Sequence, residues 1–111
     1  MPDQRREPRL SLRLEVQWNG CDERIPDVTS DVSLGGCYVE SLNPVFVGEV
    51  LSLGLRLPFG DTLPLRCEVR YHQPTIGFGL KFLNLSNFQR SCLEGLLTYW
   101  GSGRAAVQAA A

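Results

Sequence analysis

Four stretches of this chain alternate apolar and polar residues with a period of two, the pattern of a β-strand that buries one face. These stretches are Leu12–Trp18, Leu51–Leu57, Leu63–Tyr71 and Ile76–Phe82. Two shorter candidates, Arg24–Val32 and Gly36–Glu40, lie between the first and the second, so we count six strands. Gly and Pro mark the corners, and no long helix interrupts the series. The pattern predicts an all-β fold, a small antiparallel barrel or sandwich, and a closed barrel would leave no free sheet edge.

The period changes at Ser86, where a helix is expected to begin. Ser86 and Gln89 have the spacing of a capping box, and Gly101 and Gly103 end the segment. Apolar residues then recur on one helical face, at Phe88, Cys92, Leu93, Leu96, Leu97 and Trp100. We predict that a C-terminal α-helix packs on the barrel.

The length of 111 residues fits one domain with one core. We divide it into a flexible N-terminal arm (1–11), a barrel with its C-terminal helix (12–103) and a frayed tail (104–111). No run approaches the roughly 20 apolar residues of a membrane span, and the N-terminus is charged where a secretory signal would be apolar. These features predict a cytoplasmic protein without membrane insertion.

Charge and composition exclude several classes of function. A formal net charge of −1 and a pI of about 5.8 argue against a broad surface for a nucleic acid polymer. The four cysteines contain no C-x-x-C pair, and His72 is the only histidine, so the chain offers neither a zinc site nor an evident catalytic triad. Asp22, Glu23 and Asp27 lack the spacing of a calcium loop. We expect no metal, no cofactor and no enzyme.

Three arginines lie close together in "QRREPRLSL", residues 4–12. Pro8 disfavours a helix here, so Arg5 and Arg9 are separated by up to roughly 13 Å along an extended chain. A guanidinium keeps its charge, forks two hydrogen bonds to a phosphate or a guanine edge, and stacks on a base. The cluster therefore suits a nucleotide-sized anion, although a solvated arm without a specific role has the same composition.

A second polar stretch, "SDVSLGG", occupies residues 30–36. Asp31 and Ser33 offer a carboxylate and a hydroxyl, while Gly35 and Gly36 permit positive φ and expose backbone N–H groups. These groups can orient a ligand, but an ordinary turn has the same residue types.

Taken together and in this order, the two stretches resemble the signatures of the PilZ family of cyclic di-GMP receptors. Arg5 and Arg9 match R-x-x-x-R, and Asp31, Ser33 and Gly36 match D/N-x-S-x-x-G. The resemblance covers approximately residues 4–100, including "GGCYVES" and "IGFGLKFLNLS". It implies a six-stranded antiparallel β-barrel with the arginine arm folding over its surface.

The resemblance also implies a ligand and roles for six residues. Arg5 and Arg9 would contact guanine edges, phosphates or base faces of cyclic di-GMP, with Arg6 as an auxiliary contact. Asp31 and Ser33 would recognise a guanine, and Gly36 would shape the turn. The expected function is a receptor and adaptor whose arm becomes ordered on binding and which then signals to an unidentified partner protein.

Three alternatives stay open at this point. The first is an adaptor of the same family that works by protein contacts without the nucleotide, because some members lack binding. The second is a small nucleic-acid-binding barrel that stacks bases on Trp18, Tyr38 or Phe59. The third is a flavin-binding split-barrel enzyme.

Overall fold

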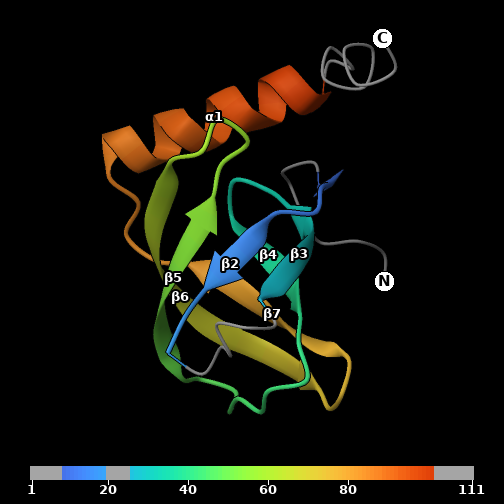
Figure 1. The fold of residues 1–111 in the computed structure, drawn as a ribbon. Helices are drawn as coiled ribbons and strands as arrows, with labels where there is room; N and C mark the ends of the chain where they lie inside the picture. Colours follow the sequence, from blue (N-terminus) through green and yellow to red (C-terminus); the bar gives the residue numbers. More distant parts are fainter. Residues whose placement is uncertain (1–8, 20–25, 102–111) are drawn as a thin grey trace, which may run out of the picture.

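The computed structural model describes residues 9–19 and 26–101, which form seven β-strands and one α-helix (Figure 1). Arg5, Arg6 and the predicted tail 104–111 lie outside the described residues. The elements are β1 Leu10–Ser11, β2 Glu15–Gln17, β3 Asp27–Val32, β4 Gly36–Glu40, β5 Val50–Arg56, β6 Thr62–Gln73, β7 Gly77–Phe82 and α1 Asn87–Gly101.

Six of the strands form a closed antiparallel barrel, which confirms the predicted fold. Around the barrel the order is β3, β2, β5, β6, β7, β4, and β4 pairs with β3 to close the ring. The short strand β1 is a seventh, and it pairs with β3 through Leu10 opposite Val32 and Ser11 opposite Asp31. Closure leaves the six barrel strands without a free edge.

The alternation of apolar residues correctly predicts most of the core. The leucines of β5 and most of the alternating apolar positions of β6 point inward and are buried: Leu51, Leu53, Leu55, Leu63, Leu65, Cys67 and Val69. The prediction is wrong for Tyr71 and Ile76, which are 45% and 59% exposed. Ile76 lies in the turn before β7, and an irregularity in the pairing of β6 turns Tyr71 outward.

Helix α1 lies across one end of the barrel (Figure 1). Its predicted capping box is confirmed: Gln89 Oε1 accepts from the Ser86 N–H at 2.7 Å, and Ser86 Oγ accepts from the Gln89 N–H at 3.1 Å. Leu93 and Leu96 enter the core, whereas Phe88 is 71% exposed, so the prediction that it packs on the barrel is wrong. Within the described residues, no helix is both long and apolar enough to span a membrane.

The N-terminal strand is divided in two where it crosses β3. The predicted strand Leu12–Trp18 is regular only over β2, and β1 begins two residues before it. At the break, the hydroxyl of fully buried Thr29 accepts from the Leu14 N–H at 2.9 Å and donates to the Leu12 carbonyl at 2.6 Å. Because these hydrogen bonds replace missing ladder bonds, Thr29 fixes the segment that carries Arg9 against β3.

Candidate functional site

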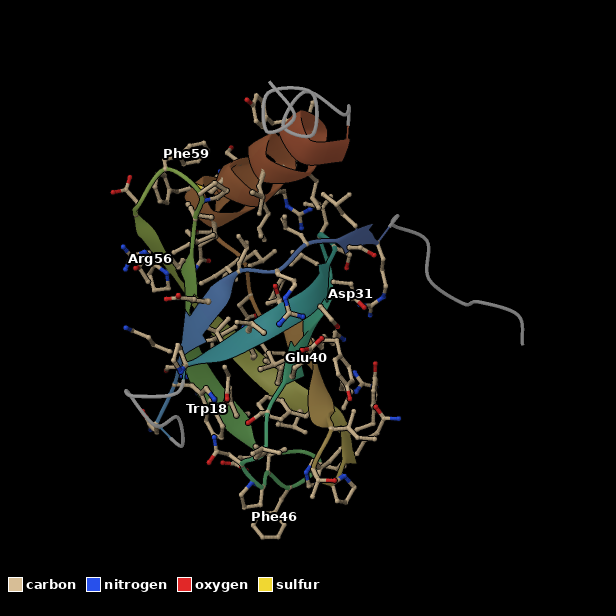
Figure 2. All side chains as sticks on the ribbon, turned by 45° about the vertical axis from the view of Figure 1, so that its right-hand side comes forward. Trp18, Asp31, Glu40, Phe46, Arg56 and Phe59 are labelled. Carbon is tan, nitrogen blue, oxygen red and sulfur yellow. The ribbon has the colours of Figure 1, made fainter. Side chains whose placement is uncertain are left out.

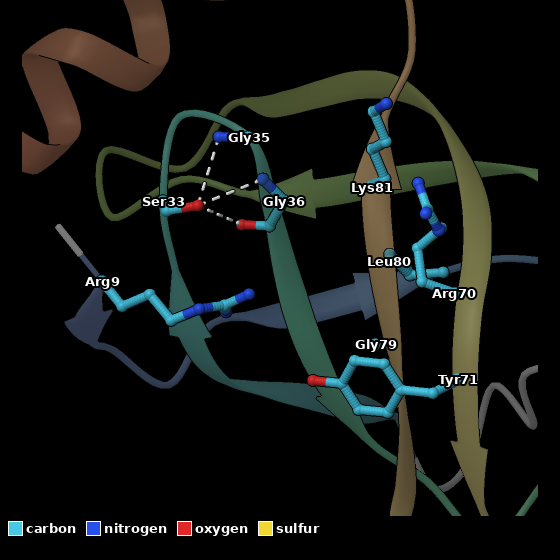
Figure 3. Close-up of a pocket in the computed structure, with 9 residues that line it drawn as sticks. All are labelled: Arg9, Ser33, Gly35, Gly36, Arg70, Tyr71, Gly79, Leu80 and Lys81. Atoms are coloured by element: carbon cyan, nitrogen blue, oxygen red, sulfur yellow. Dashed lines mark hydrogen bonds between the residues drawn. The ribbon is translucent and has the colours of Figure 1, made fainter. Parts of the chain in front are cut away.

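A hollow of about 190 Å³ lies on the outside of the barrel, where the N-terminal segment, the β3–β4 turn, β6 and β7 meet (Figure 3). Its lining consists of Arg9, Ser33, Gly35, Gly36, Arg70, Tyr71, Gly79, Leu80 and Lys81. Arg9 and Tyr71 reach into it from opposite sides, and Arg70 and Lys81 lie above the tyrosine ring in this view (Figure 3). Three cationic side chains therefore surround one concave surface, which favours an anion.

Arg9, Ser33 and Gly36 of the two sequence motifs line this hollow, whereas Asp31 contacts Arg9 but is not among the lining residues. Arg9 Nη1 donates a hydrogen bond to Asp31 Oδ1, and the two side chains form an ion pair. The pairing of β1 with β3 places Ser11 opposite Asp31, so the backbone holds Arg9 beside that carboxylate. Residues that are 22 positions apart in the sequence thus share one site.

Ser33 organises the β3–β4 turn through its side chain. Its Oγ accepts from the N–H groups of Gly35 and Gly36, both at 3.2 Å, and lies 3.3 Å from the Gly36 carbonyl. The backbone closes the same turn, because the Ser33 N–H donates to the Gly36 carbonyl at 2.8 Å. With only 4% of its surface exposed, Ser33 presents the backbone of the turn to the hollow more than its own hydroxyl.

Gly36 is required for the packing of two strands. The sequence suggested glycine here for positive φ, but among the described residues the glycines with positive φ are Gly48 and Gly60. A Cβ added at Gly36 would lie 2.0 Å from the Leu80 carbonyl oxygen on β7. The signature glycine therefore lets β4 approach β7 at the floor of the hollow.

Two β-bulges orient the side chains on either side of the site. In β3 the register shifts between Thr29 and Asp31, and in β6 it shifts between Val69 and Tyr71. Each bulge adds one residue, so two consecutive side chains leave the core: Ser30 with Asp31, and Arg70 with Tyr71. Bulges commonly redirect side chains near functional sites, and here both redirect groups toward the hollow or its edge.

The tyrosine ring rests on a strand that lacks a side chain beneath it. A Cβ at Gly79 would lie 2.3 Å from Tyr71 Cζ, so only glycine leaves room for the ring in this position. Tyr38 packs beside it, with the ring centroids 6.0 Å apart, and donates a hydrogen bond from its hydroxyl to Gln73. Burial and the neighbouring Tyr71 raise the pKa of Tyr38 above its ordinary value.

Sequence reasoning missed the three long polar or aromatic side chains that line the hollow from β6 and β7: Arg70, Tyr71 and Lys81. The alternation placed Tyr71 in the core, and Arg70 and Lys81 have the pattern of ordinary solvent-facing positions. The glycines of "GFG" in β7 were the available signal, because they indicate that something approaches closely. For Gly79 that neighbour is an aromatic ring. For Gly77 it is the Val39 carbonyl oxygen, which would lie 2.2 Å from an added Cβ.

Two buried cysteines, Cys37 and Cys67, lie in the strands that border the site. Burial raises the pKa of Cys37 well above its usual range and that of Cys67 to about 12, so neither is a reactive thiolate. Over residues 9–19 and 26–101, no group of three His, Cys, Asp or Glu side chains is arranged to hold a metal ion.

The aromatic residues considered for a nucleic-acid-binding barrel do not form one surface. Trp18 packs edge-on against Phe78, with ring centroids 5.3 Å apart, and donates to Asp27. Phe59 is 72% exposed in the β5–β6 turn, far from Trp18 along the barrel (Figure 2). Successive bases of one strand would not find a continuous stacking platform on these rings.

Comparison with known protein families gives one match that covers most of the chain. The family model described as PilZ domain matches residues 3–99. No curated protein sequence matches this chain.

Solved structures include two similar folds. The inhibitor of motility MotI/DgrA of Bacillus subtilis superposes with a TM-score of 0.69 at 20% identity, over 90% of this chain and 52% of that one. This chain therefore spans about half the length of the Bacillus protein. The PilZ domain of CeSA from a cellulose-synthesizing bacterium gives a TM-score of 0.59 at 21% identity, over 80% of this chain and 97% of that one.

Proposed function

This chain belongs to the PilZ domain family, and from that premise we propose that it is a receptor for cyclic di-GMP that passes the signal to a partner protein. The observation that carries the proposal is that Arg9, which pairs with Asp31, and the Ser33–Gly36 turn line one cationic hollow.

The chemistry of the hollow, together with Asp31 beside Arg9, is complementary to the parts of this ligand. Cyclic di-GMP has two phosphates, which suit the guanidinium and ammonium groups of Arg9, Arg70 and Lys81. Each guanine offers an edge of N–H donors, which suits the carboxylate of Asp31, and an aromatic face, which suits the ring of Tyr71. We assign phosphate contacts to the cations, guanine recognition to Asp31 and base stacking to Tyr71.

The size of the hollow supports a role for the arm. Clefts that enclose drug-sized ligands usually measure about 300–1,000 Å³, whereas this hollow measures about 190 Å³. It accommodates part of a cyclic dinucleotide and leaves the remainder open to further contacts. We propose that Arg5 and Arg6 supply them, so that the ligand favours a conformation with the arm closed over the site.

A calorimetric titration with cyclic di-GMP tests this function. We expect binding by the wild-type protein, no binding of cyclic di-AMP, and a loss of about tenfold or more in Arg9→Ala, because a hydrogen bond to a charged group contributes about 1.5–3 kcal/mol. Arg13→Ala is the matched control. Arg13 is an arginine of the same N-terminal segment, but it pairs with Glu40 at 3.0 Å and does not line the hollow.

The outcomes separate the receptor from its main alternative. Binding that is lost in Arg9→Ala and kept in Arg13→Ala supports the receptor. Absence of heat and of any thermal shift with cyclic di-GMP would contradict it and favour the nucleotide-independent adaptor. Equal losses in both variants would show that general positive charge, not the Arg9 site, attracts the ligand.

A further inference from the structure

The side chains of Arg9 and Asp31 form an ion pair with each other. Their side chains are 22% and 29% exposed, so the ion pair is partly shielded from water. The Nε–H of Arg9 is buried, and it is the one buried side-chain nitrogen or oxygen without a hydrogen-bond partner among the described residues. The guanidinium is thus held in a position that satisfies the carboxylate but leaves one of its own donors unused.

This arrangement affects ligands differently according to the groups that they carry. A ligand whose phosphate takes over the Arg9 Nη1 donor leaves the Asp31 carboxylate, which is 29% exposed, without its cation. A ligand that offers only an edge of N–H donors leaves the guanidinium unpaired. A ligand with both groups replaces each lost partner, and the Nε–H becomes available to its phosphate once Arg9 leaves the ion pair.

We propose that the Arg9–Asp31 ion pair is an internal lock that makes the site selective for ligands carrying both an anionic group and a guanine-like donor edge. The inference rests on the proposed function and extends it from the binding of one ligand to discrimination between ligands. The lock weakens the binding of simple phosphates, because they open the pair without replacing the cation that Asp31 loses.

The expected effect of the lock on ligand affinity follows from the strength of the attraction between the two charges. A ligand that binds only the open form has its apparent affinity reduced by the fraction of molecules that are open. For an ion pair that is partly buried, we expect this reduction to be about three- to tenfold. Removing Asp31 should therefore raise the affinity for inorganic pyrophosphate by that factor.

Glu40→Gln provides the matched control for charge. Asp31→Ala removes a negative charge as well as the lock, and the loss of charge alone attracts anions. Glu40 is a carboxylate on the adjacent strand of the same β3–β4 hairpin and on the same side of the barrel, but it pairs with Arg13 (Figure 2). An electrostatic effect without a lock would appear in both variants, whereas the lock predicts a gain for Asp31→Ala that clearly exceeds that for Glu40→Gln.

The first readout needs no ligand. In ¹⁵N-labelled protein, the Arg9 Nε–H signal is assigned by its absence from the spectrum of Arg9→Lys. This hydrogen should exchange slowly with water in the wild type and in Glu40→Gln. It should exchange fast in Asp31→Ala and in Asp31→Asn, which keeps the shape of the side chain and matches the family signature. An Nε–H that stays equally protected without the Asp31 charge would overturn the lock.

The second readout is titration of the same proteins with pyrophosphate and with cyclic di-GMP. The lock predicts that Asp31→Ala binds pyrophosphate about three- to tenfold more tightly than the wild type and cyclic di-GMP more weakly. Unchanged pyrophosphate affinity would refute the lock even if the wild type binds cyclic di-GMP. Conversely, a gain for pyrophosphate and a loss of Nε–H protection would support the lock even if cyclic di-GMP does not bind and the receptor proposal fails.

Discussion

The substitution Gly36→Ala tests whether the signature glycine is a packing requirement of the barrel. The added Cβ would lie 2.0 Å from the Leu80 carbonyl oxygen and 3.1 Å from the Leu80 carbonyl carbon, whereas ordinary contacts begin at 3.4 Å. The oxygen belongs to the backbone of β7, which pairs with β4 over Gly36 to Glu40. No side-chain rotation can relieve this contact, so the two strands must separate by more than an ångström.

The cost of that separation can be estimated from known effects. Overpacking a well-packed interior costs about 1–3 kcal/mol, and each ladder hydrogen bond lost or weakened costs about 1 kcal/mol more. We expect Gly36→Ala to lower the free energy of unfolding by about 3 kcal/mol or more. For a domain of this size, that corresponds to a fall in Tm of about 15 °C.

Thermal and urea unfolding followed by circular dichroism measure the effect, with Gly95→Ala as the control. Gly95 lies in α1, and a Cβ added there would meet no atom within 4 Å, so the same chemical change should stabilise the protein by about 0.5–1 kcal/mol through helix propensity. Two substitutions of one type should thus act in opposite directions. A Tm for Gly36→Ala within about 3 °C of the wild type would refute the packing explanation.

Three further predictions concern the supports of the site. Thr29→Val removes the hydroxyl that bridges the divided N-terminal strand, and leaving two backbone groups unpaired should cost about 1–3 kcal/mol; an unchanged Tm would contradict this. Gly79→Ala should displace the half-exposed ring of Tyr71 and weaken cyclic di-GMP binding about tenfold with a smaller loss of stability, since one stacked base contributes about 1–3 kcal/mol; calorimetry and thermal unfolding of the same sample check both parts. Cys67 should resist a thiol reagent at pH 8 while Cys92 reacts. Because folding raises the pKa of Cys67 from 9.0 to about 12, its contribution to stability is complete below pH 9 and declines as the pH rises toward 12. Urea unfolding at pH 8 and pH 11 should therefore show a larger loss in the free energy of unfolding for the wild type than for Cys67→Ala.

The fold could be predicted largely from local patterns. The inward positions of β5 and most of β6 follow from alternation, since successive side chains of a strand point to opposite faces. The start of α1 follows from Ser86 and Gln89, whose hydrogen bonds join residues three apart. These features depend on residues that are close together in the sequence, so they can be predicted from the sequence alone.

The candidate site could be predicted only in part. The two motifs identified Arg9 and Asp31 as site residues, but nothing in the sequence indicated that they bond to each other or that Thr29 holds the intervening strand in place. Arg5 and Arg6, which the resemblance assigns to the ligand, lie outside the described residues and stay a prediction.

What the sequence by itself determined is the identity of the strands, the face that most of them bury, the beginning of the helix and the signature residues. Tertiary structure alone decided the register between strands, and with it the bulge that turns Arg70 and Tyr71 outward together. It also decided that Gly36 faces the Leu80 carbonyl and that Gly79 lies beneath a tyrosine ring. The physical reason is that alternation specifies direction relative to the strand, whereas pairing between distant strands specifies which side chains share a surface.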